Sequence, residues 1–233
     1  MKILAFDTAL AGCAVAVLDT ETGKCTARLR PQQRGQSETL VPLIKVVVEE
    51  AGMAFDDLDR IVTTIGPGSF TGLRIGLSAA RSFALALDIP VDGVLTTECV
   101  VACFFNKNNA LNGTLLCALE TKREDFYVQA FSFENKALGD AVAIPAQRVL
   151  GDYKDMPLTL CGDGVIRLKD ELADAWPQAW NAVEGFDLID PAVLAQLGAA
   201  RAESGMLTPP GPVYLRGADV SQPNRPGRTI AES

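Results

Sequence analysis

Residues 65–76 of this chain read Ile-Gly-Pro-Gly-Ser-Phe-Thr-Gly-Leu-Arg-Ile-Gly, and they decide how the sequence around them is interpreted. An apolar run over residues 59–65 predicts a strand before them, and residues 73–87 follow with helical spacing. At such a strand-to-helix connection, backbone N–H groups and the helix dipole favour anions. However, no Gly-Lys-Ser/Thr follows, as a Walker A loop requires, and the segment departs from G-x-G-x-x-G by one residue. A tight turn that needs glycine dihedrals is therefore the better interpretation of the motif alone.

The helix after this loop carries small residues at every fourth position, with leucines beside them. The ridge and its flanks are Gly72, Gly76, Ala80 and Ala84, with Leu73 and Leu77. A ridge of this kind lets another helix approach closely. Two interpretations stay open: a helix buried inside its own chain, or a helix that covers the sheet with one face and offers the ridge to another subunit. The second makes these six residues a candidate partner interface.

The sequence before the loop predicts a three-stranded meander and a helix. Residues 2–8, 13–18 and 25–29 are apolar runs joined by tight turns, which is typical of antiparallel neighbours. Ser37 is a candidate N-cap for the helix that follows, and Gly52 is a candidate residue for its end. The order of elements predicts an α/β lobe.

The second half of the chain begins again with strands. Runs at 115–119, 126–133 and 158–161 predict strands, and residues 191–203 predict a late helix. Residues 106–109, Asn-Lys-Asn-Asn, are interpreted as the loop between the two halves.

Three segments follow from this order. Residues 1–105 are expected to form an N-terminal lobe that carries the pairing surface. Residues 106–217 are expected to form a C-terminal lobe, whose last helix and strand could return to the first lobe. Residues 218–233 are polar and contain Pro and Gly, which indicates a disordered tail. Each half starts with a strand that carries an acid near an edge, Asp7 or Glu120, which suggests a structural repeat without a sequence repeat.

Composition excludes several classes of function, because the 233 residues contain no histidine. Without an imidazole there is no Ser-His-Asp triad, Cys-His dyad or histidine-containing zinc site. The net charge of −8 argues against a protein that mainly binds a phosphate backbone. Six scattered cysteines without a C-x-x-C pair are typical of core thiols in a reducing compartment. With no visible signal peptide and no bilayer-length apolar run, we expect a soluble cytoplasmic protein with no membrane partner.

Five residues could lie near a nucleotide. Asp7 and Thr8 end the first strand, where a carboxylate can hold Mg²⁺ or face a phosphate, and Gly66, Gly68 and Ser69 open the glycine-rich loop. A lone strand-end Asp is more often a turn former. Ser69 has no imidazole partner, so it is not a hydrolase nucleophile. We expect no catalytic residue and no metal site.

Three further features carry less weight. Residues 162–164, Gly-Asp-Gly, could line a nucleotide pocket, but by themselves they are interpreted as a plain turn. Tyr214 could anchor a late strand or a partner contact. A modest basic cluster is interpreted as a solvated sheet edge; it consists of Lys24, Arg28, Arg30 and Arg34.

Three blocks, taken in order, resemble one bacterial family. Residues 3–8 (Ile-Leu-Ala-Phe-Asp-Thr), 66–76 and 212–216 (Pro-Val-Tyr-Leu-Arg) are similar to the TsaB family, also called YeaZ. The resemblance extends over nearly the whole chain, and Gly-Pro-Gly-Ser-Phe-Thr-Gly is its most specific part. It implies the α/β actin-like ATPase fold (ASKHA, ribonuclease H-like), with two related lobes that contain mixed sheets.

The resemblance also implies a function. It implies a noncatalytic scaffold and activating subunit, required with TsaD and TsaE for threonylcarbamoyl transfer to N6 of the adenosine adjacent to the anticodon (t6A), in tRNAs reading codons that begin with A. TsaD holds its metal with histidines, so a chain without histidine fits the noncatalytic paralogue. The family implies TsaD and TsaE as partners, a homodimer in isolation, and tRNA contacted indirectly through the complex. No cofactor of its own is implied, although ATP or ADP could lie at the junction with TsaD.

Two rival functions stay open. An ATP-dependent small-molecule phosphotransferase of the same fold would use Asp7 and the glycine loops around ATP·Mg²⁺, but the chain lacks the insertions that enclose a sugar-kinase substrate. A self-associating structural module would need no complex at all. The chain departs from the family at Gln36, where histidine is common, and at residues 120–122, Glu-Thr-Lys, where Asp-Ala-Arg is common.

Overall fold

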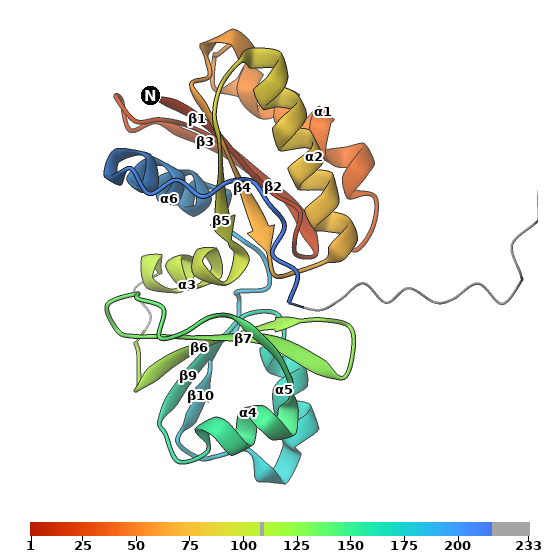
Figure 1. The fold of residues 1–233 in the computed structure, drawn as a ribbon, viewed down its shortest axis with the longest axis vertical. Coiled ribbons are helices and arrows are strands. Elements are labelled where there is room, and N and C mark those ends of the chain that lie inside the picture. Colours follow the sequence, from red (N-terminus) through yellow and green to blue (C-terminus); the bar gives the residue numbers. More distant parts are fainter. Residues whose placement is uncertain (108–109, 216–233) are drawn as a thin grey trace, which may run out of the picture.

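Two five-stranded sheets organise the part of the chain that the structure, a computed structural model, describes: residues 1–107 and 110–215 (Figure 1). The first sheet has the strand order β3-β2-β1-β4-β5. Strand β2 is antiparallel to β1 and β3, whereas β1, β4 and β5 run parallel. The strands are β1 (Lys2–Asp7), β2 (Gly12–Asp19), β3 (Cys25–Pro31), β4 (Arg60–Gly66) and β5 (Val91–Leu95).

The second sheet repeats this topology. Its order, read from one edge, is β8-β7-β6-β9-β10, with β6 antiparallel to β7 and parallel to β9. In each sheet the first strand is central, a meander extends on one side, and parallel crossovers extend on the other. The strands are β6 (Thr114–Glu120), β7 (Asp125–Phe131), β8 (Val142–Pro145), β9 (Leu158–Cys161) and β10 (Trp180–Ala182). The expected fold class, two related α/β lobes with mixed sheets, is confirmed.

The helices cover both faces of the first sheet. Alternate residues of β1 point to opposite sides: Leu4 and Phe6 pack against α1 and α2, whereas Ile3 and Ala5 pack against α3 and α6. This burial on both faces explains why β1 is apolar throughout. The helices are α1 (Gln36–Glu50), α2 (Phe70–Leu87), α3 (Thr96–Asn106), α4 (Ala146–Tyr153), α5 (Val165–Leu172) and α6 (Pro191–Ser204), with short 3₁₀ turns at Phe55–Asp57 and Ala173–Ala175.

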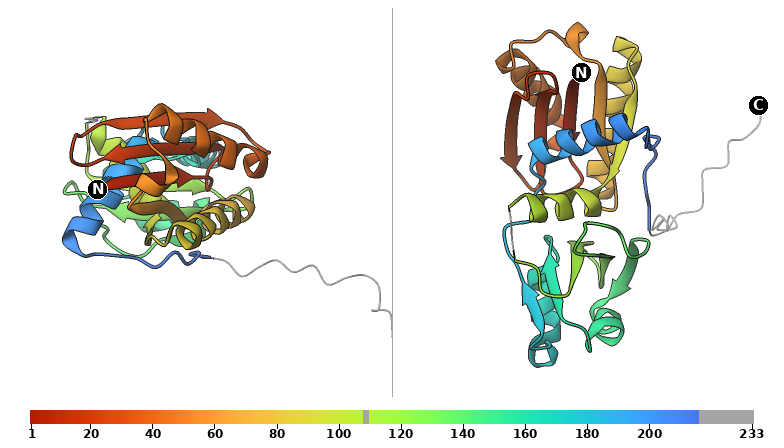
Figure 2. Two further views of the ribbon diagram at one scale, coloured as in Figure 1. Left: turned by 90° about the horizontal axis from the view of Figure 1, so that it is seen from above. Right: turned by 90° about the vertical axis from the view of Figure 1, so that its left-hand side faces the viewer.

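Helix α3 lies between the two sheets and packs against both (Figure 2). The hydrophobic core around α3 also contains Leu115, Cys117 and Leu119 of β6. Helices α4 and α5 cover the opposite face of the second sheet. The boundary predicted between residues 105 and 106 falls in the last turn of α3. The predicted tail at 218–233 lies outside the described residues, and the loop at 106–109 is described in part.

Several boundaries differ from those expected. Helix α1 starts at Gln36, one residue before Ser37, and Gly35 is its N-cap. Pro42 lies in its second turn and is exposed, so the backbone carbonyl that loses its intrahelical hydrogen bond can bond to water instead. Gly52 ends it as expected: Gly52 N–H donates to Glu49 O and Met53 N–H to Val48 O, a Schellman arrangement. Helix α2 begins at Phe70, three residues earlier than the periodicity indicated.

The six cysteines are all described and form no disulfide, and five of them are buried, as expected for core thiols. In the described part of the chain, no helix combines the length and the apolar character needed to cross a bilayer.

The segment after α6 returns along the first lobe. Gly93 N–H donates to Thr208 O at 2.9 Å, Arg81 donates to Pro210 O at 2.6 Å, and Val213 N–H donates to Ile65 O at 2.7 Å. Residues 211–215 are irregular, so the strand expected at 213–216 does not form within the described residues. The segment instead pairs with the free edge of β5 and then reaches the end of β4.

Arg201 of α6 holds this return in place, which gives a first prediction. Its guanidinium donates to Gly93 O and Thr208 Oγ1, each at 3.1 Å, and pairs with the carboxylate of Glu98. Arg201→Ala should lower the free energy of unfolding by ~2 kcal/mol, because Glu98 is left in a partly buried place without its cation. Urea denaturation measures this. Arg148→Ala is the matched control: its exposed pair on α4 should contribute under ~1 kcal/mol, and equal losses would contradict the account.

Candidate functional site

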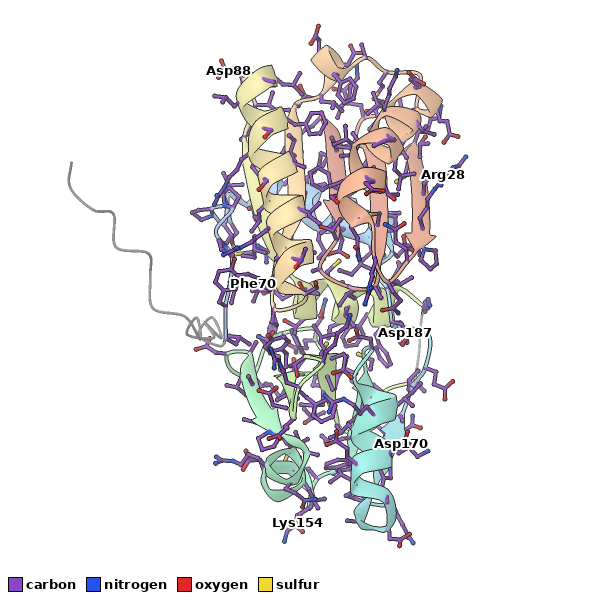
Figure 3. The ribbon with its side chains drawn as sticks, turned by 90° about the vertical axis from the view of Figure 1, so that its right-hand side faces the viewer. Arg28, Phe70, Asp88, Lys154, Asp170 and Asp187 are labelled. Atoms are coloured by element: carbon purple, nitrogen blue, oxygen red, sulfur yellow. The ribbon has the colours of Figure 1, made fainter. Side chains whose placement is uncertain are left out.

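A cleft of about 830 Å³ lies between the two lobes and is lined by both. The first lobe contributes the turn after β1, the segment before α1 and the start of α2. The second lobe contributes the turn after β6 and Asp163, and the C-terminal segment adds Val213 and Tyr214. Phe70, one of the residues that line the cleft, is labelled in Figure 3 near the junction of the two lobes.

The glycine-rich loop forms the wall of the cleft by packing on the β1–β2 turn. Ser69 N–H donates to Ala9 O at 2.8 Å, and Thr8 Oγ1 donates to Gly72 O at 2.7 Å. A Cβ on Gly68 would lie 2.8 Å from Ala9 O, and one on Gly72 only 1.9 Å from Thr8 O. The glycines therefore allow two backbone segments to touch, which supports the interpretation as a tight turn.

Three backbone donors of this segment, at Ser69, Gly72 and Leu73, are used within the protein. Ser69 caps α2, since its Oγ accepts from Gly72 N–H at 3.2 Å while its O accepts from Leu73 N–H at 2.8 Å. Pro67 has no N–H to offer. The loop is a joint between β4, α2 and the β1–β2 turn rather than an open phosphate cradle.

Asp7 is also committed to internal hydrogen bonds. Its Oδ1 accepts from Ala9 N–H at 2.9 Å and from Thr64 Oγ1 at 2.5 Å, and the residue is 2% exposed. Burial raises the pKa of this carboxyl. Asp7 and Thr8 do not line the cleft. The residues present do not fit a Mg²⁺ ion held by Asp7 beside ATP.

Of the five residues that the sequence suggested could lie near a nucleotide, only two line the cleft. Gly68 and Ser69 line the cleft, whereas Asp7, Thr8 and Gly66 lie behind it. Gly66 has a φ of 109°, and a Cβ there would lie 2.7 Å from Val213 O. The absence of a side chain at Gly66 therefore allows the C-terminal segment to pack against the end of β4.

Asp163 is a cleft residue that the sequence indicated only weakly. It follows β9 and accepts a 2.9 Å hydrogen bond from Glu120 N–H at the end of β6. Burial raises the pKa of Asp163 to about 7, and the charges of Glu120 and Asp187 add to the rise. A plain turn would not bury its carboxyl in a cleft, so the interpretation of residues 162–164 as a turn alone is incomplete.

Glu120 itself is paired. Its Oε2 accepts from Arg167 Nε at 2.7 Å and its Oε1 from Lys122 N–H at 2.5 Å. Arg167 also lies over the Phe126 ring at 3.7 Å, which fixes the guanidinium. The two carboxyls that line the cleft therefore differ: Glu120 has a cationic partner, whereas the described contacts of the Asp163 side chain include no cation.

The small-residue ridge of α2 faces inward. A Cβ on Gly76 would lie 2.8 Å from Thr8 Oγ1 and 3.4 Å from Thr63 Oγ1, because α2 crosses β1 and β4 closely. Five of the six candidate interface residues are buried against the chain's own core: Gly72, Leu73, Gly76, Leu77 and Ala80, with Ala84 half-buried. This corrects the expected partner surface, since a buried residue has no surface to offer, and it favours the first of the two interpretations.

The outward faces of α1 and α2 carry a different apolar set. Val41 and Val46 of α1 are exposed, and Leu85 of α2 is 86% exposed. The two helices lie side by side on the same face of the first sheet (Figure 1). The sequence could have indicated these positions, because they interrupt the polar side of each helix.

Comparison with known proteins gives consistent results. The family model described as "TsaD: tRNA N6-adenosine threonylcarbamoyltransferase" matches residues 30–160. "tRNA threonylcarbamoyladenosine biosynthesis protein TsaB" of Bacillus subtilis (strain 168) is 30% identical over 183 residues, covering 75% of this chain and 76% of the relative. The protein of the same name from Escherichia coli (strain K12) is 32% identical over 127 residues, covering 54% of this chain, and the match spans about half, 53%, of that relative.

Among solved structures, YeaZ from Pseudomonas aeruginosa superposes with a TM-score of 0.79. The superposition covers 92% of this chain and 99% of the other, at 24% identity. At that identity the likeness shows the fold, and it extends over both lobes.

Proposed function

Because the chain belongs to the TsaB family of tRNA threonylcarbamoyladenosine biosynthesis proteins, we propose that it is the noncatalytic scaffold and activating subunit of a complex that makes t6A. The match to the Bacillus subtilis protein over three quarters of both chains carries this proposal. The complex transfers a threonylcarbamoyl group to N6 of the adenosine adjacent to the anticodon, in tRNAs reading codons that begin with A. TsaD, in this proposal, performs the transfer, and TsaE completes the complex.

The site supports a noncatalytic role in two ways. The chain has no histidine to hold a metal as TsaD does. Its strand-end carboxylate, Asp7, is used to shape a turn, so an ATP·Mg²⁺ centre would have to be built without it. For the same reason the rival function, a small-molecule phosphotransferase, gains no support. We place any ATP or ADP of the complex at the junction with TsaD.

We propose that the pairing surface lies on the outward faces of α1 and α2. Val41, Val46 and Leu85 expose apolar side chains on these two adjacent helices, and exposed apolar surface supports an interaction site. We propose that this surface takes TsaD in the complex, and that the isolated chain forms a homodimer.

Leu85→Glu tests this placement. A charge buried at an interface without a partner should weaken binding to TsaD by ~2 kcal/mol or more, which is about 30-fold or more. Calorimetry with the cognate TsaD measures it. Leu138→Glu is the matched control, because Leu138 is also exposed but lies beyond β7 in the second lobe. Undiminished binding by folded Leu85→Glu would remove the surface assignment, whereas failure of the unaltered chain to bind TsaD would remove the proposed function.

A further inference from the structure

Four cationic side chains line the interlobe cleft. Arg34 precedes α1, Arg74 lies on α2, and Lys122 and Arg123 follow β6. All four are exposed, and they come from both lobes. The whole chain carries a net charge of −8, so this is a local reversal of sign in an acidic protein.

The carboxyls of the cleft compensate this charge only in part. Glu120 pairs at 2.7 Å with Arg167, whose guanidinium also pairs with Glu171 outside the cleft lining. Asp163, with its pKa raised to about 7, is only partly ionised at neutral pH. Among the residues that line the cleft, the four cations therefore outnumber the two carboxyls.

Two aromatic rings and a guanidinium pack against one another in the lining of the same cleft. The ring centroids of Phe70 and Tyr214 are 5.2 Å apart, and the Arg74 guanidinium lies 3.9 Å from the Phe70 centroid. Both rings are partly exposed, at 43% each. Exposed aromatic rings beside cations are the surfaces on which successive bases of single-stranded nucleic acids stack.

Short polar side chains supply the remaining chemistry. Gln33, Ser37 and Thr71 line the cleft with amide and hydroxyl groups. Such groups can hydrogen-bond the edges of an unpaired base or a ribose 2′-hydroxyl.

We propose that the interlobe cleft binds a short single-stranded segment of RNA, with phosphates at Arg34 and Lys122 and a base against Tyr214. The inference rests on the proposed function, in which tRNA is the RNA. It departs from the expectation that tRNA is contacted only through the partner. A free nucleotide fits less well, because Ser69 N–H already donates to Ala9 O and Gly72 N–H to Ser69 Oγ, and Pro67 has no N–H to offer a phosphate.

Fluorescence anisotropy with the full chain and a labelled heptaribonucleotide tests the proposal. Binding should weaken about sevenfold between 50 and 200 mM salt, as expected for about two phosphate contacts on a single strand. The double variant Arg34→Glu/Lys122→Glu should bind at least tenfold more weakly and with a shallower salt slope. Tyr214→Ala should lose about tenfold with an unchanged slope, because a stacked base is not a phosphate contact.

The matched control is Arg148→Glu/Lys154→Glu, which makes the same change in net charge on and beside α4. Lys154 lies at the far end of the second lobe from Phe70 (Figure 3). This control should bind within twofold of the unaltered chain. No binding at 50 mM salt, equal losses in both double variants, or full displacement of the RNA by ATP or AMP would each overturn the proposal.

Calorimetry with TsaD on the same variants separates this inference from the proposed function. Arg34→Glu/Lys122→Glu should pair with TsaD as the unaltered chain does. A chain that pairs with TsaD and supports t6A formation but binds no RNA contradicts the cleft assignment alone.

Discussion

Gly72→Ala should lower the free energy of unfolding by about 3 kcal/mol or more. The added Cβ would stand 1.9 Å from Thr8 O, a backbone atom that cannot rotate away. Either the start of α2 must move off the β1–β2 turn or the turn must shift, and the 2.7 Å hydrogen bond from Thr8 Oγ1 to Gly72 O is lost in both cases. Urea denaturation followed by circular dichroism measures the change.

Gly151→Ala is the control for Gly72→Ala. Gly151 is also helical, in α4, but a Cβ there meets no heavy atom within 4 Å. Alanine should therefore stabilise that helix by up to ~1 kcal/mol through its higher helix propensity. If the two variants shift stability in the same direction and by similar amounts, the close packing of the glycine-rich loop on the β1–β2 turn is refuted.

Asp163→Asn should make the protein more stable at neutral pH but not in acid. The carboxyl titrates near its ordinary 3.8 in the unfolded chain, whereas burial raises its folded pKa to about 7. Between these values the unfolded chain gives up its proton first, so the stability of the unaltered protein falls as the pH rises from ~4 to ~7. A difference of about three pKa units corresponds to at most ~4 kcal/mol, and we expect about half of this in a cleft open to water.

The asparagine variant keeps the acceptor for Glu120 N–H and removes the charge. Its free energy of unfolding should match that of the unaltered chain at pH 4 and exceed it by ~2 kcal/mol at pH 7.5. Asp155→Asn, an exposed change just after α4 and outside the ion pair of Arg148 with Asp152, is the control. If the stability difference between Asp163→Asn and the unaltered chain did not change with pH, the carboxyl of Asp163 would not be buried in the folded cleft.

The sequence predicted the first sheet well, because its strands are apolar runs separated by recognisable turns. Helix α3 was missed for a physical reason: Cys99, Val100, Val101, Ala102, Cys103 and Phe104 are all buried. A helix enclosed between two sheets has no polar face, so it shows no amphipathic period. Strands β8 and β10 and helices α4 and α5 span only three to eight residues, which is too few for a periodic pattern to identify an element with security.

The ridge on α2 shows a different limit of prediction. Small residues at every fourth position of a helix allow another element to approach it closely. That element can be a strand of the same chain as well as a helix of another subunit. Here Gly72 and Gly76 meet Thr8 and Thr63 of the chain's own sheet. Only the burial of each side chain distinguishes the two cases, and burial depends on the crossing of α2 over the sheet.

The cleft could not be assembled from sequence. Arg34, Lys122 and Asp163 are far apart in the chain and meet only because the lobes pack on α3. The sequence groups Arg34 with Lys24, Arg28 and Arg30 in a solvated sheet edge. In the fold, Arg34 instead lines the cleft together with residues of the second lobe.

The most direct test of the central claim is t6A itself, measured by mass spectrometry of digested tRNA. The reaction contains the cognate TsaD and TsaE, tRNA, threonylcarbamoyl-adenylate and ATP, with and without this chain. Our account predicts that t6A accumulates when the chain is present and falls to background when it is omitted. Equal t6A formation without the chain would contradict its role as the activating subunit.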